Sequence, residues 1–227
     1  MYIFEKIEQK DKVAAVEKLI ENSTPSHGFY LMVVLAMAMA AIGLLLDNTA
    51  IVIGSMLVSP LLFSLLGVAM GLSMSDIKLI TRSMHSFLRS VFLGIVVAFI
   101  ITLLFSSLDE SLNREILSRT FSGLPFLAVS VIAGLAAAFS VVNPKLNESF
   151  SGIAISVALI PPVATIGIGL GVLNFSVVRG AFVLLLINVG GILAASLIAF
   201  SAMNFHSKKK LADKVIKSEE KELQNNN

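Results

Sequence analysis

The sequence predicts an all-α integral membrane protein with six transmembrane helices, built as two inverted three-helix repeats whose second and fifth helices are broken by proline. Three observations support this prediction. Of the 227 residues, 56% are hydrophobic and only 14% are charged, whereas about a quarter of the residues in a soluble domain are charged. Apolar stretches close to the roughly 20 residues that cross a bilayer recur along the chain. One apolar motif that contains proline also occurs twice.

The predicted membrane domain occupies residues 29–203, and its two repeats cover about 29–108 and 124–201. The very short link Asp47-Asn48 predicts a tight hairpin between the first two helices. Each helix is placed on one apolar stretch, and the six predicted spans are 29–46, 49–72, 90–108, 124–142, 151–173 and 177–201.

Amphipathic and polar segments flank these spans. Residues 1–28 predict a cytoplasmic amphipathic helix that lies on the membrane surface or, alternatively, binds a partner. Residues 204–227 predict a basic, then polar, cytoplasmic tail. The segments 73–89 and 109–123 carry apolar residues at helical spacing and predict further interfacial helices. The apolar face of the N-terminal helix holds Val13, Val16, Leu19 and Ile20.

The distribution of Lys and Arg predicts the orientation. With the N-terminus inside, 14 of the 17 Lys and Arg residues fall in inside segments. The other three, Arg114, Arg119 and Arg179, fall outside. Because cytoplasmic loops carry the excess of positive charge, both termini are expected in the cytoplasm.

The duplicated motif covers residues 50–60 and 152–162, which a shift of 102 positions aligns. The second span runs inward and the fifth outward, so the two copies have opposite orientations. Broken helices at matching positions of inverted repeats indicate a transport site near the bilayer midplane. The shift pairs Ile51 with Ile153, Leu57 with Leu159, Pro60 with Pro162 and Gly67 with Gly169, and a weaker match pairs Arg89-Ser90-Val91-Phe92 with Arg179-Gly180-Ala181-Phe182.

Proline explains why the two helices break. It lacks a backbone donor and clashes with the preceding turn. Ser59 and Pro60 resemble an N-cap followed by proline at the first helical position, and Pro161-Pro162 predicts a second helix start. The half-helices, roughly 60–72 and 162–173, would direct their N-termini at the midplane. Simple kinks, with Ser and Thr satisfying the backbone, are the alternative.

Polar and proline residues near the breaks define the predicted site for a substrate or ion. Ser64 also follows the first break, and Asp47 and Asn48 are expected to flank a pore mouth. The predicted site residues are Ser55, Ser59, Pro60, Ser156, Pro161, Pro162, Thr165 and Asn188.

Glycine pairs four residues apart follow both breaks, Gly67 with Gly71 and Gly167 with Gly171. Small residues at this spacing let helices approach closely. They favour packing within one chain, with an oligomer interface as the alternative.

Several function classes are disfavoured. The chain has no Cys, and no Asp, Glu, Lys or Arg lies in the middle of a predicted span, which disfavours a carboxylate-based proton pump. There is no nucleotide-binding loop, metal-ligand cluster or nucleophile–base pair. We therefore expect neither an enzyme nor a catalytic residue, metal, cofactor or nucleic-acid partner.

Two motifs carry a resemblance to a known family. Residues 48–61, Asn-Thr-Ala-Ile-Val-Ile-Gly-Ser-Met-Leu-Val-Ser-Pro-Leu, and residues 151–162 resemble, in order, two motifs of the prokaryotic hydrophobic family called domain of unknown function 389. The resemblance covers about residues 27–203. It implies a protein of the prokaryotic inner membrane, and it brings no agreed activity or catalytic residues.

The sequence thus favours a homo-oligomeric transporter or channel for a small ion or solute. The alternative is a non-transporting membrane scaffold or stress sensor that acts through its cytoplasmic ends.

Overall fold

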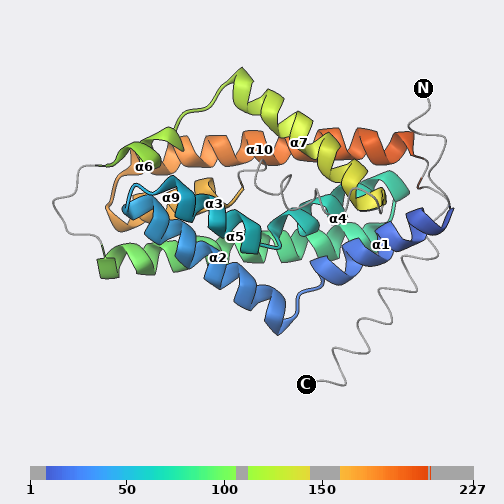
Figure 1. Cartoon of the computed structure of the whole chain (residues 1–227), viewed down its shortest axis with the longest axis horizontal. Helices are drawn as coiled ribbons and strands as arrows, with labels where there is room; N and C mark the ends of the chain where they lie inside the picture. The colour runs from blue at the N-terminus through green and yellow to red at the C-terminus, as the bar shows by residue number, and fades with distance from the viewer. Residues whose placement is uncertain (1–8, 106–111, 144–158, 204, 206–227) are drawn as a thin grey trace.

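The computed structural model describes residues 9–105, 112–143, 159–203 and 205. The described residues form helices and turns and no strand, which confirms the all-α prediction (Figure 1). The helices are α1 (Gln9–Ser23), α2 (His27–Leu45), α3 (Thr49–Val58), α4 (Leu61–Met74), α5 (Ile77–Phe105), α6 (Arg114–Ser118), α7 (Leu124–Val142), α9 (Ile160–Gly171) and α10 (Phe175–Ala202).

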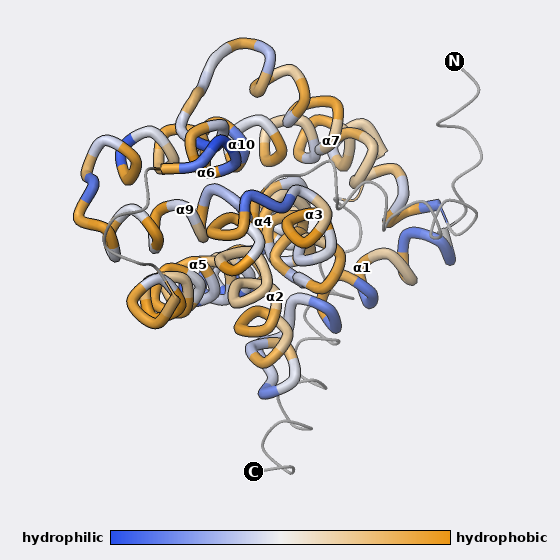
Figure 2. Tube along the Cα trace, turned by 60° about the vertical axis from the view of Figure 1, so that its left-hand side comes forward, coloured by the Kyte–Doolittle hydropathy of each residue, from blue (hydrophilic) through white to orange (hydrophobic). Residues whose placement is uncertain are grey.

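Four helices, α2, α5, α7 and α10, are long and apolar enough to cross a membrane. The bent pair α3 and α4 makes a fifth candidate span, whereas α9 is a shorter apolar helix. The strongly hydrophilic stretches gather in α1, in α6 and at helix ends (Figure 2). The described part therefore has the helices of a multi-pass membrane protein, with four or five candidate spans where the sequence predicted six. Residues 151–158 of the predicted fifth span lie outside the described residues.

One of the two predicted interfacial segments differs from the structure. Segment 73–89 is not a separate helix, because α5 runs without interruption from Ile77 to Phe105. One buried face continues along its whole length, so its first turns pack against the protein. In segment 109–123, the described helix is limited to the short α6. The buried face of α5 consists of Leu79, Ser83, Ser86, Phe87, Ser90, Gly94, Ala98 and Thr102.

The N-terminal helix forms near its predicted position, but its apolar face does not lie on the membrane surface. It packs against α4 and α7, which bury Val16 and Leu19 completely. The ammonium group of Lys12 donates a hydrogen bond to the carbonyl of Met203 and lies 5.8 Å from the ring centroid of Phe205. The protein's own helices thus cover the face that was expected to meet lipid or a partner.

Three helix-to-helix connections share one turn. In each, a glycine carbonyl accepts the N–H of the residue five positions later, and the residue between the helices has a left-handed conformation with φ of 52° to 54°. An Asp or Asn then caps the next helix. This arrangement is a Schellman motif joined to an N-cap. The turns are Gly43–Asp47–Asn48 between α2 and α3, Gly71–Ser75–Asp76 between α4 and α5, and Gly169–Leu173–Asn174 between α9 and α10.

Glycine begins each turn because the next helix folds back directly over it. A Cβ at Gly71 would lie 3.0 Å from the backbone nitrogen of Ile80, and one at Gly169 would lie 3.1 Å from that of Val178. Both contacts are tighter than side chains ordinarily make. The shared glycine makes α4–α5 and α9–α10 two hairpins of the same construction.

The two hairpins also pack against each other, because each short helix contacts the long helices of both hairpins. Helix α5 packs against α4 and α9, and α10 packs against α9 and α4. Helix α2 covers α5, and α7 covers α10. In Figure 1, α5 runs from right to left and α10 from left to right, so the two long helices have opposite directions.

This turn corrects part of the predicted alignment. It pairs Gly169 with Gly71, a shift of 98 residues, whereas the motif pairs Gly169 with Gly67. The difference of four residues is about one helical turn. The same register places Arg179 opposite Thr81, whereas the predicted match placed it opposite Arg89.

The glycine pairs pack inside the chain, as favoured from the sequence. Gly67 and Gly71 face Ser83 and Ile80 of α5. Gly167 and Gly171 face the later part of the same helix. Helix α5 is therefore held closely between α4 and α9.

We expect Gly167→Ala to destabilise the protein by about 1–3 kcal/mol, the usual cost of overpacking. The new Cβ would lie 2.5 Å from the carbonyl oxygen of Ile95 and 2.6 Å from the Cβ of Ala98. Gly190→Ala is the matched control, because nothing lies within 4 Å of its Cβ position. Unfolding in detergent, followed by circular dichroism, measures the difference, and equal stability of the two variants would contradict the packing.

We also expect Leu173→Gly to stabilise the protein by about 1 kcal/mol, because a left-handed conformation is costly for residues other than glycine. Leu173 has φ of 54° and is 77% exposed, so little packing is lost. Leu173→Val should be less stable than wild type, since β-branched residues tolerate positive φ poorly. A lower melting temperature for Leu173→Gly than for the wild type would show that this turn is not formed.

Candidate functional site at the helix breaks

The first break lies at Ser59 and Pro60, as predicted. Helix α3 ends at Val58, α4 begins at Leu61, and the two helix axes differ by 50°. Ser59 has extended backbone (φ −81°, ψ 132°), and its Oγ accepts the N–H of Leu61 at 3.3 Å. The Ser59 hydroxyl therefore accepts the first backbone N–H of α4, which has no partner within the helix. The helix begins one residue later than expected.

The second break is described on one side only. Helix α9 begins at Ile160, which places Pro161 and Pro162 in its first turn. There the missing N–H of proline has no helical partner to lose. Both prolines are buried. The predicted start of this half-helix is confirmed, while Ser156, on the other side of the break, lies outside the described residues.

Two hydroxyl groups of the half-helices are fully buried and have no hydrogen-bond partner among the residues that the structure describes. They are Ser64 Oγ in α4 and Thr165 Oγ1 in α9. A buried hydroxyl without a partner costs about 1–3 kcal/mol. By contrast, Ser55 Oγ donates to the carbonyl of Val52 at 2.6 Å, within its own helix. Thr165 and Ser64 are therefore the hydroxyls with capacity left for a ligand.

Asn188 lies in a contact between two long helices. Its Oδ1 accepts the hydroxyl of Ser130 at 2.9 Å, which links α10 to α7. Further along the same interface, Ser196 Oγ donates to the carbonyl of Gly134 at 3.0 Å. Glycine allows this close approach, since a Cβ at Gly191 would lie 2.6 Å from Ser130 Cβ. Sequence reasoning missed Ser130 because the sequence gives no register between the fourth and sixth spans.

Asp47 and Asn48 lie in the turn between α2 and α3, where their side chains cap helices. Asn48 Oδ1 accepts the N–H groups of Ala50 and Ile51, and Asp47 Oδ1 accepts the N–H of Glu115 at 2.8 Å. Asn113 completes the contact by donating to the carbonyls at the end of α2. These hydrogen bonds explain why Asp and Asn occur at positions 47 and 48, and they join the turn to α6.

The carboxylate of Glu115 is the charged centre of this contact. It accepts hydrogen bonds from Thr49 and, at 3.0 Å, from Arg119. Burial raises the pKa of the Glu115 carboxyl, but these hydrogen bonds and the charges of Arg119 and Arg114 outweigh burial and hold the pKa below its ordinary value.

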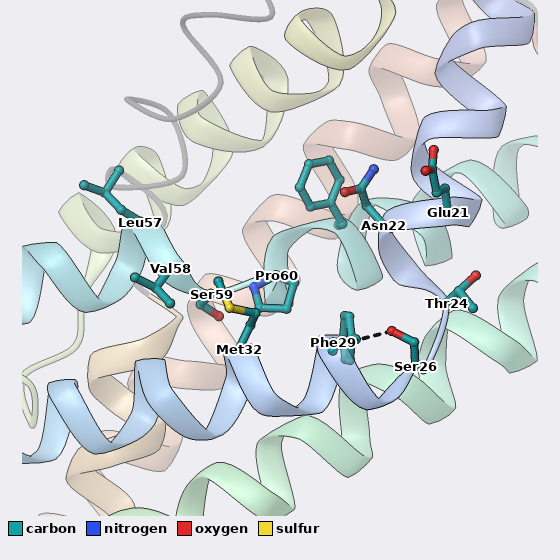
Figure 3. A pocket seen from close by; sticks show the side chains of 12 residues that line it. Glu21, Asn22, Thr24, Ser26, Phe29, Met32, Leu57, Val58, Ser59 and Pro60 are labelled. Atoms are coloured by element: carbon teal, nitrogen blue, oxygen red, sulfur yellow. Dashed lines mark hydrogen bonds between the residues drawn. The ribbon is translucent and has the colours of Figure 1, made fainter. Parts of the chain in front are cut away.

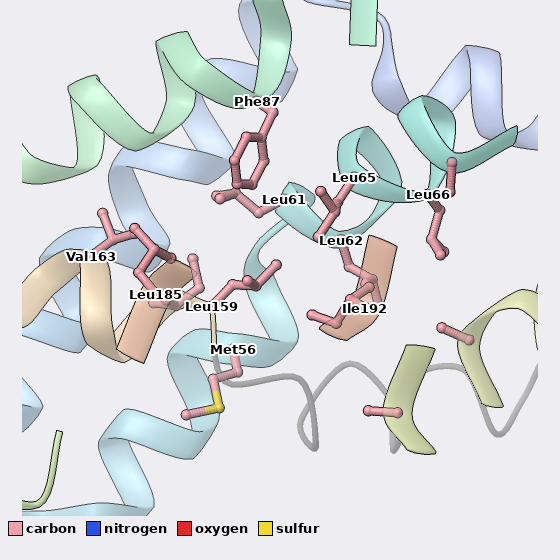
Figure 4. Packing of buried hydrophobic residues seen from close by; sticks show 14 of the residues in the cluster. Met56, Leu61, Leu62, Leu65, Leu66, Phe87, Leu159, Val163, Leu185 and Ile192 are labelled. Atoms are coloured by element: carbon pink, nitrogen blue, oxygen red, sulfur yellow. The ribbon is translucent and has the colours of Figure 1, made fainter. Parts of the chain in front are cut away.

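Apolar side chains fill the described space around the two helix starts. Leu61 begins α4 and Leu159 precedes α9, and both belong to one buried cluster with Val163 and Leu185 (Figure 4). Met56, near the end of α3, packs into the same cluster. An ion or solute that passed between the breaks would have to displace these side chains.

A pocket of about 360 Å³ opens at the first break. In Figure 3, Ser59 and Pro60 lie near Met32 and Phe29 of α2, while Glu21, Asn22 and Thr24 come from the end of α1. The predicted site residues Ser59 and Pro60 thus face a space large enough for a small molecule.

The fold and its breaks define the class of protein: a multi-pass helical membrane protein with one proline-broken helix and a half-helix that starts at two prolines. Within this class, the chain belongs to the family described as domain of unknown function (DUF389), which matches residues 56–194.

An uncharacterized protein of Methanocaldococcus jannaschii is 29% identical over 173 residues, which are 76% of this chain and 53% of that relative. The chain therefore spans about half the length of the curated relative that it matches. No solved structure matches the chain.

We expect part of the stability to be lost in acid through Glu115. A carboxyl whose pKa is lower in the folded state stabilises the fold above its ordinary pKa of about 4.3. That stability disappears as pH falls through the lower folded pKa. Glu115→Gln should remove this part of the pH dependence of unfolding, and Glu17→Gln on the exposed side of α1 should not. An unchanged acid-unfolding profile for Glu115→Gln would contradict the assignment.

Proposed function

We propose that the protein is a transporter or channel for a small ion or solute, with its site at the paired breaks. The observation that carries the proposal is the pair of hairpins α4–α5 and α9–α10. Each short helix begins at proline inside the apolar body, and the two long helices run in opposite directions. Inverted repeats with interrupted helices at corresponding positions are typical of transport sites.

The reciprocal packing supports two inverted repeats. In the proposal, α2 to α5 form one repeat, and α7 to α10 with the intervening segment form the other. The matching turns at Ser75–Asp76 and Leu173–Asn174 then lie at opposite membrane faces. In the proposal, Ser75–Asp76 lies on the cytoplasmic side of the prokaryotic inner membrane together with both chain ends, because cytoplasmic segments carry the excess of Lys and Arg.

The site chemistry follows from the helix starts and the buried hydroxyls. Pro60, Pro161 and Pro162 shape the breaks, and Ser59 caps the first half-helix. Thr165 Oγ1 and Ser64 Oγ supply hydrogen-bonding groups that are free in the described structure. In this proposal they contact the passing ion or solute, while Ser55 and Asn188 support the helices through the bonds that they already make.

A conducting or alternating state requires the apolar cluster between the breaks to open. The 50° bend at Ser59–Pro60 separates α3 from the α4–α5 hairpin, which makes it the natural hinge. The Leu61 and Leu159 side chains would move with the half-helices that follow them. The alternative, a scaffold or sensor without transport, has less support, because α1 buries its apolar face within the protein.

The proposal is tested by flux into proteoliposomes that contain Thr165→Val. Valine keeps the shape of threonine and removes a hydroxyl without a partner, so stability should not fall. Loss of a hydrogen bond to the substrate should reduce flux about tenfold. The matched control is Thr102→Val, because Thr102 is equally buried but donates to the carbonyl of Ala98.

The flux panel contains K⁺, Na⁺, Cl⁻ and small organic cations. Selective loss in Thr165→Val supports the site. Equal flux in wild type and both variants would place transport elsewhere, and no flux above empty liposomes for the panel would contradict the proposed function.

A further inference from the structure

The pocket at the first break collects the ends of four helices. The ends of α1 and α3 and the starts of α2 and α4 all contribute to its wall. Its lining combines polar residues from the end of α1 and the turn after it, Glu21, Asn22 and Thr24, with apolar residues from the neighbouring helices. Because the pocket lies on the proposed hinge, its charge and shape determine what can bind there.

One carboxylate sets the charge of this lining. Glu21 is the single ionisable residue among the lining residues, which include no Lys, Arg or His. It is an exposed residue at the edge of the pocket and forms no ion pair within the described residues. Arg82 is not among the lining residues, and its guanidinium donates to the lining residue Thr24, at Oγ1, over 2.9 Å.

The helix ends do not offset that negative charge. Two C-terminal ends, which are partly negative, face two N-terminal ends, which are partly positive. At both N-terminal ends a side chain already accepts a backbone N–H. Ser26 Oγ accepts the N–H of Phe29 at the start of α2, at 3.1 Å, and Ser59 Oγ accepts the N–H of Leu61 at the start of α4. At the end of α3, Pro60 has no N–H to offer the carbonyl four residues before it. The polar side of the pocket therefore favours a cation.

The rest of the wall is apolar and partly aromatic. Phe29 and Phe63 come from α2 and α4, and Met32 is 42% exposed. Aromatic faces attract organic cations, and methionine adapts to varied apolar shapes. A strongly hydrated inorganic ion gains nothing from such a wall, whereas a cation with an attached apolar group does.

We propose that this pocket binds a small organic cation, an ammonium group carrying an apolar body, and that such cations are substrates at the first break. The ammonium group pairs with Glu21, and the apolar body lies against Phe29, Met32 and Phe63. The transport part of this inference rests on the proposed function. The ammonium group belongs either to a free amine or to the ethanolamine headgroup of a lipid.

Equilibrium dialysis of radiolabelled benzyltrimethylammonium against the full chain, in nanodiscs of phosphatidylglycerol, tests the binding. Glu21→Gln should weaken binding about fivefold to tenfold. Glu17→Gln, one turn earlier on α1, should leave it unchanged. Equal weakening by both substitutions, equal binding of the anion phenylacetate, or no saturable binding would overturn the inference.

A second variant separates pocket binding from misfolding. Gly28 lines the pocket, and the nearest atom to its Cβ position is Ser26 Oγ at 3.9 Å. Gly28→Leu should therefore fill the pocket and abolish binding while the helical circular dichroism spectrum stays that of wild type. Full binding in Gly28→Leu would place the cation elsewhere and overturn the inference.

Two further arms identify the source and separate the two proposals. If added phosphatidylethanolamine competes with the probe, the lipid headgroup is the occupant. If it does not compete, a free amine is the occupant. Both results support the binding of an ammonium group. Probe binding without any flux would overturn the proposed function alone. Flux of inorganic ions without probe binding would overturn this inference alone.

Discussion

The structure depends on one constraint: the backbone groups at a helix end that lack a partner within the helix must find one nearby. The chain meets it with a repeated local device. Three times, a glycine carbonyl accepts the amide five residues later, a left-handed residue reverses the chain, and an Asp or Asn caps the next helix. Because this arrangement turns the chain within two residues, α4–α5 and α9–α10 become close hairpins.

The proline breaks apply the same constraint inside the fold. Pro60 ends one hydrogen-bond ladder, and Ser59 supplies the acceptor that starts the next. Pro161 and Pro162 occupy positions where no donor is required. The consequence is a pair of short helices whose starts meet apolar side chains. Their hydroxyls at Ser64 and Thr165 have no hydrogen-bond partner in the described part of the chain. Such groups are costly in a static core, which is why we place function there.

The sequence predicted what local chemistry determines. The all-α class, the break at Ser59–Pro60, the helix start at Pro161–Pro162 and the packing of the glycine pairs are confirmed. It did not predict what depends on tertiary contacts: the burial of α1, the continuity of α5 through Lys78 and Arg82, or the partner of Asn188. The three turns had a visible signal, Gly-Leu followed four residues later by Asp or Asn, at Gly43, Gly71 and Gly169. The alignment of the duplicated motif obscured this signal, because the motif and the turns align the two halves of the chain with shifts that differ by about one helical turn.

The inverted arrangement of the two hairpins is the central claim, and labelling from one side of the membrane tests it directly. The chain has no cysteine, so Ser75→Cys and Leu173→Cys each introduce a single thiol at an exposed turn. A membrane-impermeant maleimide is applied to intact cells and then to permeabilised cells. The account predicts that Leu173→Cys is labelled from outside and Ser75→Cys only after permeabilisation. Labelling of both variants from the same side would contradict it.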